Sequence, residues 1–229
     1  MSGIVIIGAG QAAGQAAASL RQGKYEGSIT ILGDETQPPY QRPPLSKQYL
    51  SGELGMDRVM VRPKKFYGDQ NIALHTETRV ESIDSSAKSV TTSSGDSYQY
   101  DKLLIATGSR PRILTIPGSD LSGIHYLRTI NDVDGIREAM QAAKKICIVG
   151  GGYIGLEVAA VAVTAGLQVT VLEMEDRILQ RVTTPEMSEY YHDLHTGRGV
   201  NIMVNTDVSG FQGEGHISTV VCGDEKIDA

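Results

Sequence analysis

The chain has 229 residues, enough for one large domain or two modest ones, and its 40% hydrophobic and 21% charged residues are usual for a globular protein. The net charge of −6 argues against a nucleic-acid-binding surface, which needs clustered Lys and Arg. No apolar run reaches the length of a membrane span and the first residues lack the basic flank of a signal peptide, so we expect no membrane partner.

The first half of the chain begins with a predicted β-α-β unit. Its parts are a strand over Ile4–Gly8, a helix over Gln11–Arg21 and a strand over Ser28–Asp34. A Pro-rich loop follows over residues 36–47. Residues from about 72 to 100 show short alternating segments and Ser-Gly-Asp turn signals, which indicate a small antiparallel insertion. A buried strand over Lys102–Gly108 closes this part.

A linker over residues 109–123, with two prolines and two glycines, leads into the second half. A helix is predicted over Ile130–Ala143. A second β-α-β unit comprises a strand over Ile146–Gly150, a helix over Tyr153–Thr164 and a strand over Leu167–Glu173. A helix over Pro185–Gly197 and short strands over Val200–Ile227 complete the chain, which we divide into domains 1–111 and 112–229.

The two β-α-β units repeat one pattern: an apolar strand, a glycine cluster and an alanine-rich helix. Apolar runs of this kind are typical of buried parallel strands, so the fold class is predicted to be α/β, with two Rossmann-like dinucleotide-binding domains. Gly8 and Gly150 allow the tight turn, and Gly10 and Gly152 let the backbone approach a pyrophosphate. The helix N-terminus then offers its free N–H groups to the phosphates.

The third position of each turn, Ala13 or Gly155, permits close packing of the helix on the strand. Each following strand ends in an acid, Asp34 in the first unit and Glu173, with Glu175 beyond it, in the second. Such a carboxylate accepts ribose hydroxyls and repels a 2′-phosphate, so the second site is predicted to prefer NADH over NADPH. Two adjacent nucleotide sites make sense if one nucleotide passes hydride to the other, which favours FAD in the first.

Four motifs, "PYQRPPLSKQYL", "LLIATGSRPR", "IHYLRT" and "VGGGYIGLEVAA", carry a family resemblance. With them the whole chain resembles the FAD-dependent, NADH-oxidising ferredoxin reductases of bacterial oxygenase systems, of the putidaredoxin-reductase and rhodocoxin-reductase type. The resemblance implies a fold like that of glutathione reductase. It also implies electron transfer from NADH through FAD to a [2Fe-2S] ferredoxin that serves a cytochrome P450 or a dioxygenase.

The resemblance also implies which residues bind the cofactors. Positions matched to FAD binding are Gly8, Gly10, Ala12, Ala13, Asp34, Arg42, Lys47, Val80, Ala106, Thr107, Gly108 and Arg128. Positions matched to NADH binding are Gly150, Gly152, Ile154, Gly155 and Glu173, with Tyr153 and Glu157 at the nicotinamide end. Arg177 and Arg181 fit equally a role at the NADH phosphates or ribose and a role as caps of a surface loop.

Three residues are predicted to act in catalysis. Lys47 is expected to donate to the flavin or to pair with a carboxylate beside its N5 atom, and Glu157 to lie at the nicotinamide. The ring of Tyr153 is expected to shield the flavin until nicotinamide displaces it. Because hydride transfer needs no general acid or base, we expect no catalytic triad.

The cysteines and histidines predict no metal site and no dithiol. Cys147 and Cys222 are far apart in the sequence and outside any CxxC motif, which excludes a disulfide framework and a zinc site and favours a reducing cytoplasm. They also cannot supply the active-site cysteine pair of related disulfide reductases, so electrons must leave from the flavin itself. His192 and His195 fit a solvated helix face better than a metal site, since no third ligand accompanies them.

The resemblance further implies that the fold is incomplete at its C-terminus, because these residues match the first half to three-fifths of a reductase. An open sheet edge and weak FAD binding are then expected, and the open edges favour strand swapping or a dimer. Two alternatives remain. One is a non-catalytic dinucleotide-binding fragment or half of a split protein. The other is the same flavoenzyme fold with a rubredoxin, quinone or monodehydroascorbate acceptor.

Overall fold

The computed structural model describes residues 3–229; residues 1 and 2, which the sequence assigns to the first domain, lie outside the described residues. The chain divides into two compact units. The first comprises the chain up to Arg42 together with Gly55–Arg110, and the second comprises Pro43–Leu54 and Pro111–Ala229. The segment Pro43–Leu54 therefore packs with the second unit, although it lies within the expected first domain, 1–111.

The first unit is built on a six-stranded sheet in the order β3-β2-β1-β6-β5-β4. The strands are β1 (Gly3–Ile7), β2 (Ile29–Leu32), β3 (Ile72–His75), β4 (Val80–Asp84), β5 (Ser89–Thr92) and β6 (Ser97–Ile105). Strand β6 starts antiparallel to β5 and ends parallel to β1. One strand thus joins the parallel sheet to the β4–β5 hairpin.

The expected antiparallel insertion over 72–100 is wrong at its start. Strand β3 runs parallel to β2, with Ile72 opposite Ile29 and His75 opposite Leu32, and forms the edge of the main sheet. Its side chains alternate between buried or half-buried and exposed, because helices cover only one face of this edge. Such alternation resembles that of an antiparallel strand, which explains the misassignment.

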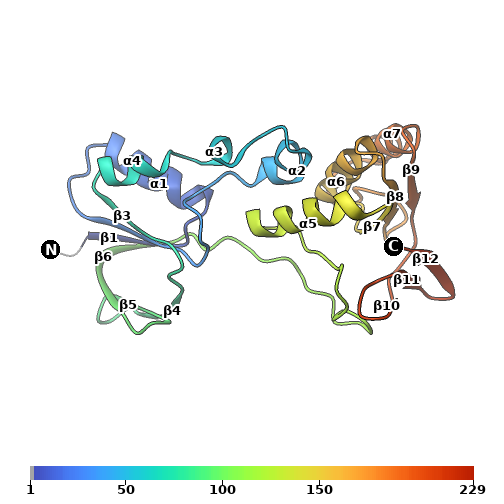
Figure 1. Ribbon diagram of the computed structural model, residues 1–229. Helices are drawn as coiled ribbons and strands as arrows, with labels where there is room; N and C mark the ends of the chain where they lie inside the picture. The colour runs from blue at the N-terminus through green and yellow to red at the C-terminus, as the bar shows by residue number, and fades with distance from the viewer. Residues whose placement is uncertain (1–2) are drawn as a thin grey trace. The chain divides into compact units, whose positions relative to one another are not determined.

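Helices and the β4–β5 hairpin lie on opposite faces of the parallel strands β1 and β2 (Figure 1). Helix α1 (Gln11–Gln22) and helix α4 (Lys64–Asp69) bury Ala13, Ala17 and Tyr67 against sheet isoleucines. On the other face, Val90 of β5 packs in a cluster with residues of β1 and β2. The short 3-10 helix η1 (Pro43–Ser46) and the helices α2 (Gln48–Ser51) and α3 (Met56–Val59) were not predicted, because four residues carry no helical period.

The second unit holds a parallel sheet in the order β7-β8-β9 and an antiparallel sheet in the order β10-β11-β12. The strands are β7 (Lys145–Val149), β8 (Gln168–Leu172), β9 (Val200–Met203), β10 (Gly210–Gln212), β11 (Thr219–Cys222) and β12 (Glu225–Asp228). The helices are α5 (Ile130–Ala142), α6 (Tyr153–Thr164) and α7 (Pro185–Thr196). Helix α6 packs on β8 through the buried Ala159 and Ala162.

Strand β7 is less buried than its apolar sequence predicts, with exposed ends and half-buried central residues. Among the described residues it pairs with β8 alone, so it is an edge strand. At its start, Lys145 forms an ion pair of 2.7 Å with Asp228 of β12. Within residues 3–229, no helix combines the length and the apolar character needed to cross a membrane.

Arg21 at the end of α1 ties three loops of the first unit together. Its guanidinium donates hydrogen bonds to the carbonyl oxygens of Gln70 (2.7 Å), Asn71 (2.8 Å), Gly27 (2.9 Å) and Tyr25 (2.5 Å). One charged group therefore satisfies the backbone at the C-terminus of α1, before β2 and before β3.

We predict that Arg21→Ala lowers the free energy of unfolding by about 2 kcal/mol, since charged hydrogen bonds to partly buried carbonyls are lost. Thermal denaturation followed by circular dichroism measures the effect. Arg58→Ala, which removes an exposed arginine of the same unit, is the control and should leave the midpoint unchanged. Equal midpoints for the two variants would contradict the role given to Arg21.

Candidate functional site

The two glycine turns have nearly the same backbone. Gly8 has φ +100° and Gly150 has φ +111°, a conformation that favours glycine. Gly10 (φ −87°, ψ −170°) and Gly152 (φ −80°, ψ 178°) are extended and precede α1 and α6, respectively. The chain thus builds one strand-to-helix turn twice.

The glycines of these turns differ in what surrounds them. A Cβ on Gly8 would lie 2.3 Å from the carbonyl oxygen of Ala106, and a Cβ on Gly155 would lie 2.1 Å from that of Gly150. A Cβ on Gly10 or Gly152 would meet no atom within 4 Å. The first two positions are closed by the protein itself, whereas the last two face open space at a helix N-terminus, where a pyrophosphate fits.

The repeat extends to the third strand of each unit. The amides of Gly33 and Glu173 donate to His75 of β3 (2.9 Å) and Met203 of β9 (2.8 Å), respectively. The carbonyl of Gly33 accepts a hydrogen bond from the amide of Thr78 (2.6 Å), and the carbonyl of Glu173 accepts one from the amide of Thr206 (2.9 Å). Gly33 and Glu173 therefore occupy equivalent positions, each one residue past the second strand.

This equivalence separates the two predicted ribose acids. Glu173 occupies the strand-end position and accepts from the amides of Gly151 (2.7 Å) and Glu175 (3.0 Å). Asp34 lies one residue further on, half exposed, and faces the guanidinium groups of Arg79 (3.8 Å) and Arg110 (3.7 Å). The acid of the second unit is held by its own glycine turn, and the acid of the first by two arginines.

An arginine–glutamate pair follows in each unit. Arg42 donates to Glu35 at 2.6 Å and to the hydroxyl of Tyr40 at 3.0 Å, and its guanidinium lies 5.0 Å from the centre of that ring. Tyr40, buried, also donates a short hydrogen bond to Glu35. Arg181 pairs with Glu175 at 2.8 Å, and this pairing raises the pKa of the Arg181 guanidinium.

Glu157 near the start of α6 joins two residues of the segment Pro43–Leu54. One of its oxygens accepts from Lys47 at 2.7 Å and from the buried hydroxyl of Ser46 at 2.5 Å. Lys47 also donates to the carbonyl of Pro43 at 3.1 Å. Lys47 and Glu157, both predicted to be catalytic, are thus brought together, while Tyr153 projects from the first turn of the same helix, 47% exposed.

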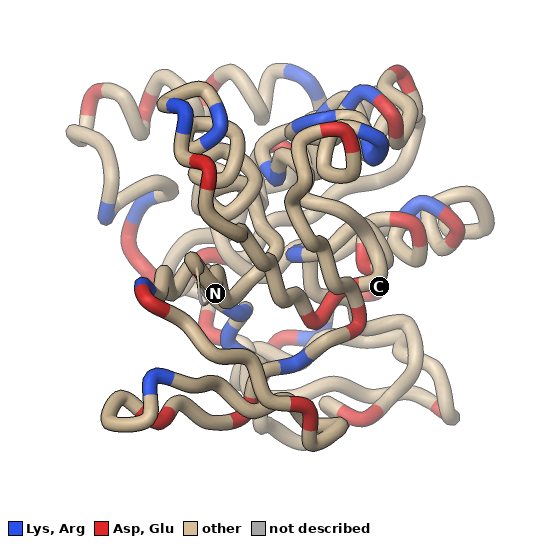
Figure 2. Tube along the Cα trace, turned by 90° about the vertical axis from the view of Figure 1, so that its left-hand side faces the viewer, with Lys and Arg blue, Asp and Glu red and all other residues tan. Residues whose placement is uncertain are grey.

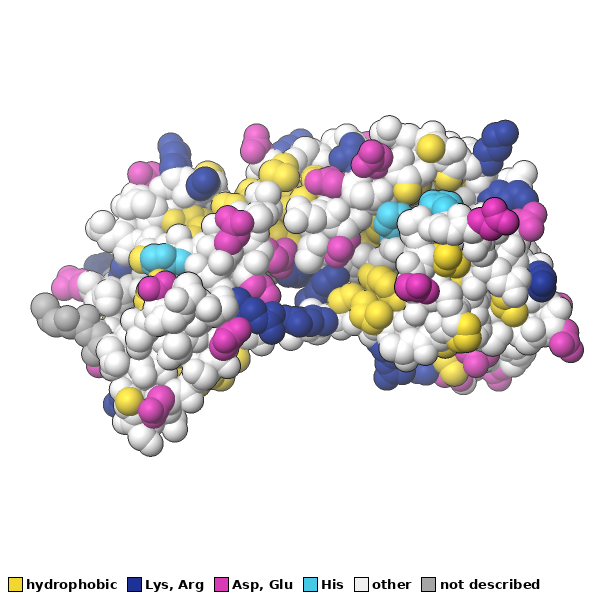
Figure 3. Space-filling model, turned by 60° about the horizontal axis from the view of Figure 1, so that its bottom comes forward, with side chains coloured by type: hydrophobic (Ala, Val, Ile, Leu, Met, Phe, Trp, Pro, Cys, Tyr) yellow, Lys and Arg dark blue, Asp and Glu magenta, His cyan; other side chains and the backbone are white. Residues whose placement is uncertain are grey.

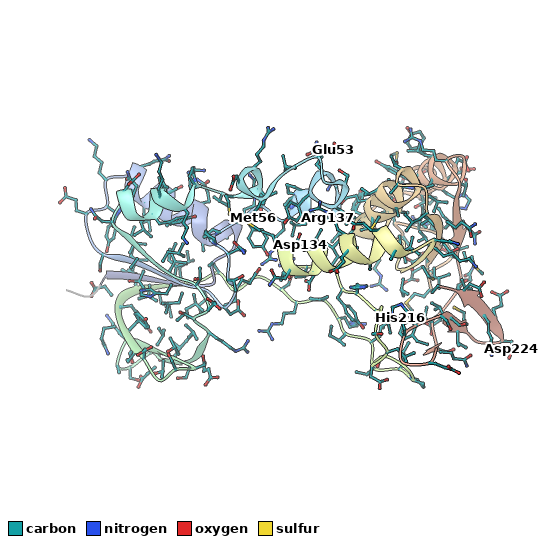
Figure 4. The ribbon with its side chains drawn as sticks, viewed as in Figure 1. Glu53, Met56, Asp134, Arg137, His216 and Asp224 are labelled. Atoms are coloured by element: carbon teal, nitrogen blue, oxygen red, sulfur yellow. The ribbon has the colours of Figure 1, made fainter. Side chains whose placement is uncertain are left out.

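The segment is held on α5 by a second polar contact. Tyr49 donates to Asp134 at 2.9 Å, and burial, with this hydrogen bond, raises the pKa of Tyr49. Asp134 and Arg137 lie on the side of α5 that faces α2 (Figure 4). The guanidinium of Arg137 lies 5.7 Å from the centre of the Tyr49 ring, within range of a cation–π contact.

The predicted cofactor-binding residues fall into two groups. Those in the first unit are Gly8, Gly10, Ala12, Ala13, Asp34, Arg42, Val80, Ala106, Thr107 and Gly108. Those in the second are Lys47, Arg128, Gly150, Gly152, Ile154, Gly155, Glu173 and Arg181. Lys47 and Arg128, predicted for the flavin, therefore belong to the unit that carries the predicted NADH residues.

The two arginines that the sequence left undecided differ in their surroundings. Arg177 donates to the carbonyls of Thr183 (3.2 Å) and Gln180 (3.1 Å) and to the hydroxyl of Ser188 (2.5 Å), so it fixes the loop before α7. Arg181 is 76% exposed beside Glu175. Sequence reasoning missed Glu35, Ser46 and Gly151. The available signal was their position, since Ser46 and Gly151 lie within the quoted motifs and Glu35 follows Asp34.

Exposed hydrophobic side chains occur at the end of β7, at the start of α6 and in the loop after β8. Each of them is more than a third exposed: Val149, Tyr153, Ile154, Met174 and Val182. Hydrophobic side chains are also visible at the surface of this unit in Figure 3. Acidic and basic residues are both scattered along the trace in Figure 2, in keeping with the mixed charge of the sequence. Exposed apolar side chains beside the open position of Gly152 suit a nucleotide with flat aromatic rings.

The cysteines lie in the same hydrophobic cluster of the second unit, packed against Leu172, Phe211 and Val220. Burial, with the neighbouring Cys222, raises the pKa of the Cys147 thiol to about 12, which disfavours a reactive thiolate. Within residues 3–229 no group of three His, Cys, Asp or Glu residues is placed to hold a metal ion.

The comparisons with known proteins agree with this geometry. The profile of the pyridine nucleotide-disulphide oxidoreductase family matches residues 2–229. A 5,5′-dehydrodivanillate O-demethylase ferredoxin reductase subunit from Sphingobium sp. (strain NBRC 103272 / SYK-6) is 43% identical over 92% of this chain and 51% of its own. A rubredoxin-NAD(+) reductase from Pseudomonas putida is 40% identical over 99% of this chain and 59% of its own.

Among solved structures, the covalent putidaredoxin reductase–putidaredoxin complex matches with a TM-score of 0.95 at 38% identity, covering all of this chain and 56% of that one. The chain spans about half the length of the curated relatives it matches. The resemblance and the fold class predicted from the sequence are confirmed.

Substituting an open glycine and a closed one should have different effects on stability and on NADH binding. Gly152→Ala should leave the midpoint of thermal unfolding unchanged, because its Cβ meets nothing, and should weaken NADH binding at least about tenfold, because the methyl group occupies the pyrophosphate space. Gly155→Ala should lower the midpoint of unfolding, because its Cβ meets the Gly150 carbonyl. Circular dichroism and calorimetric titration with NADH measure the two effects; unchanged NADH binding by Gly152→Ala would contradict the assignment.

Proposed function

We propose that this chain, which belongs to the pyridine nucleotide-disulphide oxidoreductase family, carries the FAD and NADH sites of a flavoprotein. The flavoprotein is proposed to pass electrons from NADH to a ferredoxin. The observation that carries the proposal is the repeated turn, with open space at Gly10 in the first unit and at Gly152 in the second. Two dinucleotide sites on one chain suit a reaction in which one nucleotide reduces the other.

The residues of the first unit suit FAD. Gly10 leaves room for the pyrophosphate, and Ala12 lies exposed in the first turn of α1. Gly8 approaches the Ala106 carbonyl closely, which brings the turn of Ala106, Thr107 and Gly108 to the first glycine turn. Val80 begins β4 and packs against the cluster that contains Ile7 and Leu32, at the ends of β1 and β2. When bound, FAD supplies the two-electron to one-electron chemistry that no protein side chain provides.

The residues of the second unit suit NADH. Glu173, held by two amides, presents a carboxylate to a ribose and repels a 2′-phosphate. Glu175 pairs with Arg181, so this arginine is already matched with an acid and attracts a phosphate less. We propose that Lys47, fixed by Glu157, donates to the flavin, and that the exposed ring of Tyr153 excludes water until nicotinamide binds.

The proposed acceptor is an iron–sulfur ferredoxin. Relatives are named as ferredoxin reductases, and a similar reductase forms a covalent complex with putidaredoxin. The half-buried thiol of Cys147, whose pKa is raised, does not suit reduction of a disulfide substrate. Rubredoxin is the second candidate acceptor, since a relative of nearly equal identity is named as a rubredoxin reductase. We also propose a cytoplasmic location, since both cysteines are free.

We also propose that two chains associate through an open strand edge. Residues 102–105 of β6 pair with β1 on one side, and Leu104 and Ile105 are 38% and 59% exposed. An exposed apolar edge favours pairing with another strand. Sedimentation analysis of the purified chain tests it, and a monomer at all concentrations would contradict it.

The visible absorption spectrum tests the proposed function. Purified protein supplied with FAD should show flavin bands that bleach when NADH is added without oxygen, and NADPH should bleach them more slowly. Bleaching means that both nucleotides bind and react on this chain. A colourless protein that takes up no added FAD would contradict the flavin site and favour the non-catalytic dinucleotide-binding alternative.

We predict that Glu157→Gln slows reduction of bound flavin by NADH about tenfold, because Lys47 loses the carboxylate that fixes it. Stopped-flow absorbance measures the rate. Glu138→Gln, at an exposed position of α5, is the control and should react like the wild type. A Glu157→Gln rate equal to that of the control would exclude the proposed role of the pair.

A further inference from the structure

The adenosine end of the first nucleotide site differs in charge from that of the second. In the second unit, the strand-end acid Glu173 contacts the amide of Gly151 in its own glycine turn. In the first unit this position is Gly33, where a Cβ would lie 2.3 Å from that of Ala9, so no side chain fits there. The ribose acid of the first unit is displaced by one residue to Asp34.

Two arginines, Arg79 and Arg110, lie beside Asp34 in the first unit. Nη1 of Arg79 is 3.8 Å and Nη2 of Arg110 is 3.7 Å from the same oxygen, Oδ2, of Asp34. The side chains of Arg79, Arg110 and Asp34 are 52%, 71% and 53% exposed. Both guanidinium groups are thus accessible to a ligand at the end of β2.

The backbone fixes the approach of both arginines. Thr78 donates to the carbonyl of Gly33, next to Asp34, and Ser93 donates to the carbonyl of Arg79 at 2.9 Å. Arg110 follows Gly108, whose φ of +70° turns the chain after β6. Three segments far apart in the sequence therefore meet at one edge of the sheet.

The second unit lacks this arrangement. Thr78 and Thr206 are equivalent, so the residue equivalent to Arg79 is Asp207. The acids Glu173, Glu175 and Asp207 lie at or near the end of the second strand, where Arg181 forms an ion pair with Glu175. The cationic surroundings of Asp34 are a property of the first site alone.

We propose that Arg79 and Arg110 are positioning residues of the first site, which hold the Asp34 carboxylate toward the adenosine ribose of FAD. They take the place of the glycine-turn amide that holds Glu173. They also compensate the charge of Asp34, so that a carboxylate near the ribose does not repel the anionic pyrophosphate. This inference rests on the proposed flavin site in the first unit.

FAD affinity measured by flavin fluorescence on the full chain, after removal of any bound flavin, tests the inference. Arg79→Gln and Arg110→Gln should each weaken FAD binding about two- to fivefold, the range of a half-exposed ion pair. In an Asp34→Asn background the same substitutions should cause no further loss, because the arginines act through Asp34. Arg58→Gln, at an exposed arginine of the same unit, is the control, and thermal midpoints confirm that the variants fold.

Equal FAD affinities for wild type and both arginine variants would overturn the inference while leaving the proposed function intact. A loss that persists in the Asp34→Asn background would overturn the positioning role, because a purely structural or directly contacting arginine gives additive losses. A wild-type chain that binds no FAD would overturn the inference together with the flavin site on which it rests.

Discussion

The approach of a helix N-terminus to the end of a parallel strand is the constraint on which the rest of the structure depends. The turn between them has to be made in very few residues, and only a glycine at φ near +100° makes it without strain. Gly8 is then pressed against the carbonyl of Ala106, and Gly155 against that of Gly150. These contacts leave the positions of Gly10 and Gly152 open, so the same packing that closes the turn creates the space for a phosphate.

The repeated turn does not make the two sites identical. The backbone hydrogen bonds place Gly33 and Glu173 in equivalent positions, while the side chains differ. A glycine at position 33 makes room for Ala9 in the turn, whereas Gly151 makes room for Glu173 and Ile178. In the first unit the side chain is in the turn (Ala9) and the strand end has none (Gly33), whereas the second unit has the reverse (Gly151 and Glu173). Such an exchange changes the charge presented to a nucleotide without changing the fold.

Much of the fold could be predicted from the sequence, because strongly periodic elements determine it. The helix over Tyr153–Thr164 has the predicted bounds, and the strands of both β-α-β units shift by two residues or fewer. Strand β3 was misassigned, since one covered face gives a parallel edge strand the pattern of an antiparallel one. The short helices between residues 43 and 69 were not predicted, because four to six residues are too few to show a helical repeat of hydrophobic positions.

The candidate site could be predicted in part, since the motifs name residues but not their partners. The sequence singles out Arg42 and Lys47, whereas Glu35 and Ser46, which contact Arg42 and Glu157, respectively, carry no signal of their own. The register of the ribose acids was also out of reach. It depends on a count of residues past the strand end, and the predicted strand ends were too long by two residues or fewer.

The pairing of Lys47 with Glu157, 110 positions away, depends on how the segment Pro43–Leu54 is held in the second unit. Leu45, Tyr49 and Leu50 of this segment are each at most 3% exposed, and burying such side chains contributes about 2 kcal/mol apiece. An ion pair as accessible as that of Lys47 contributes about 1 kcal/mol or less. The apolar side chains therefore fix the segment, and the ion pair is not needed to hold it. A charged pair that the fold does not require is available for chemistry, and removing its acid should change reactivity while the segment stays in place.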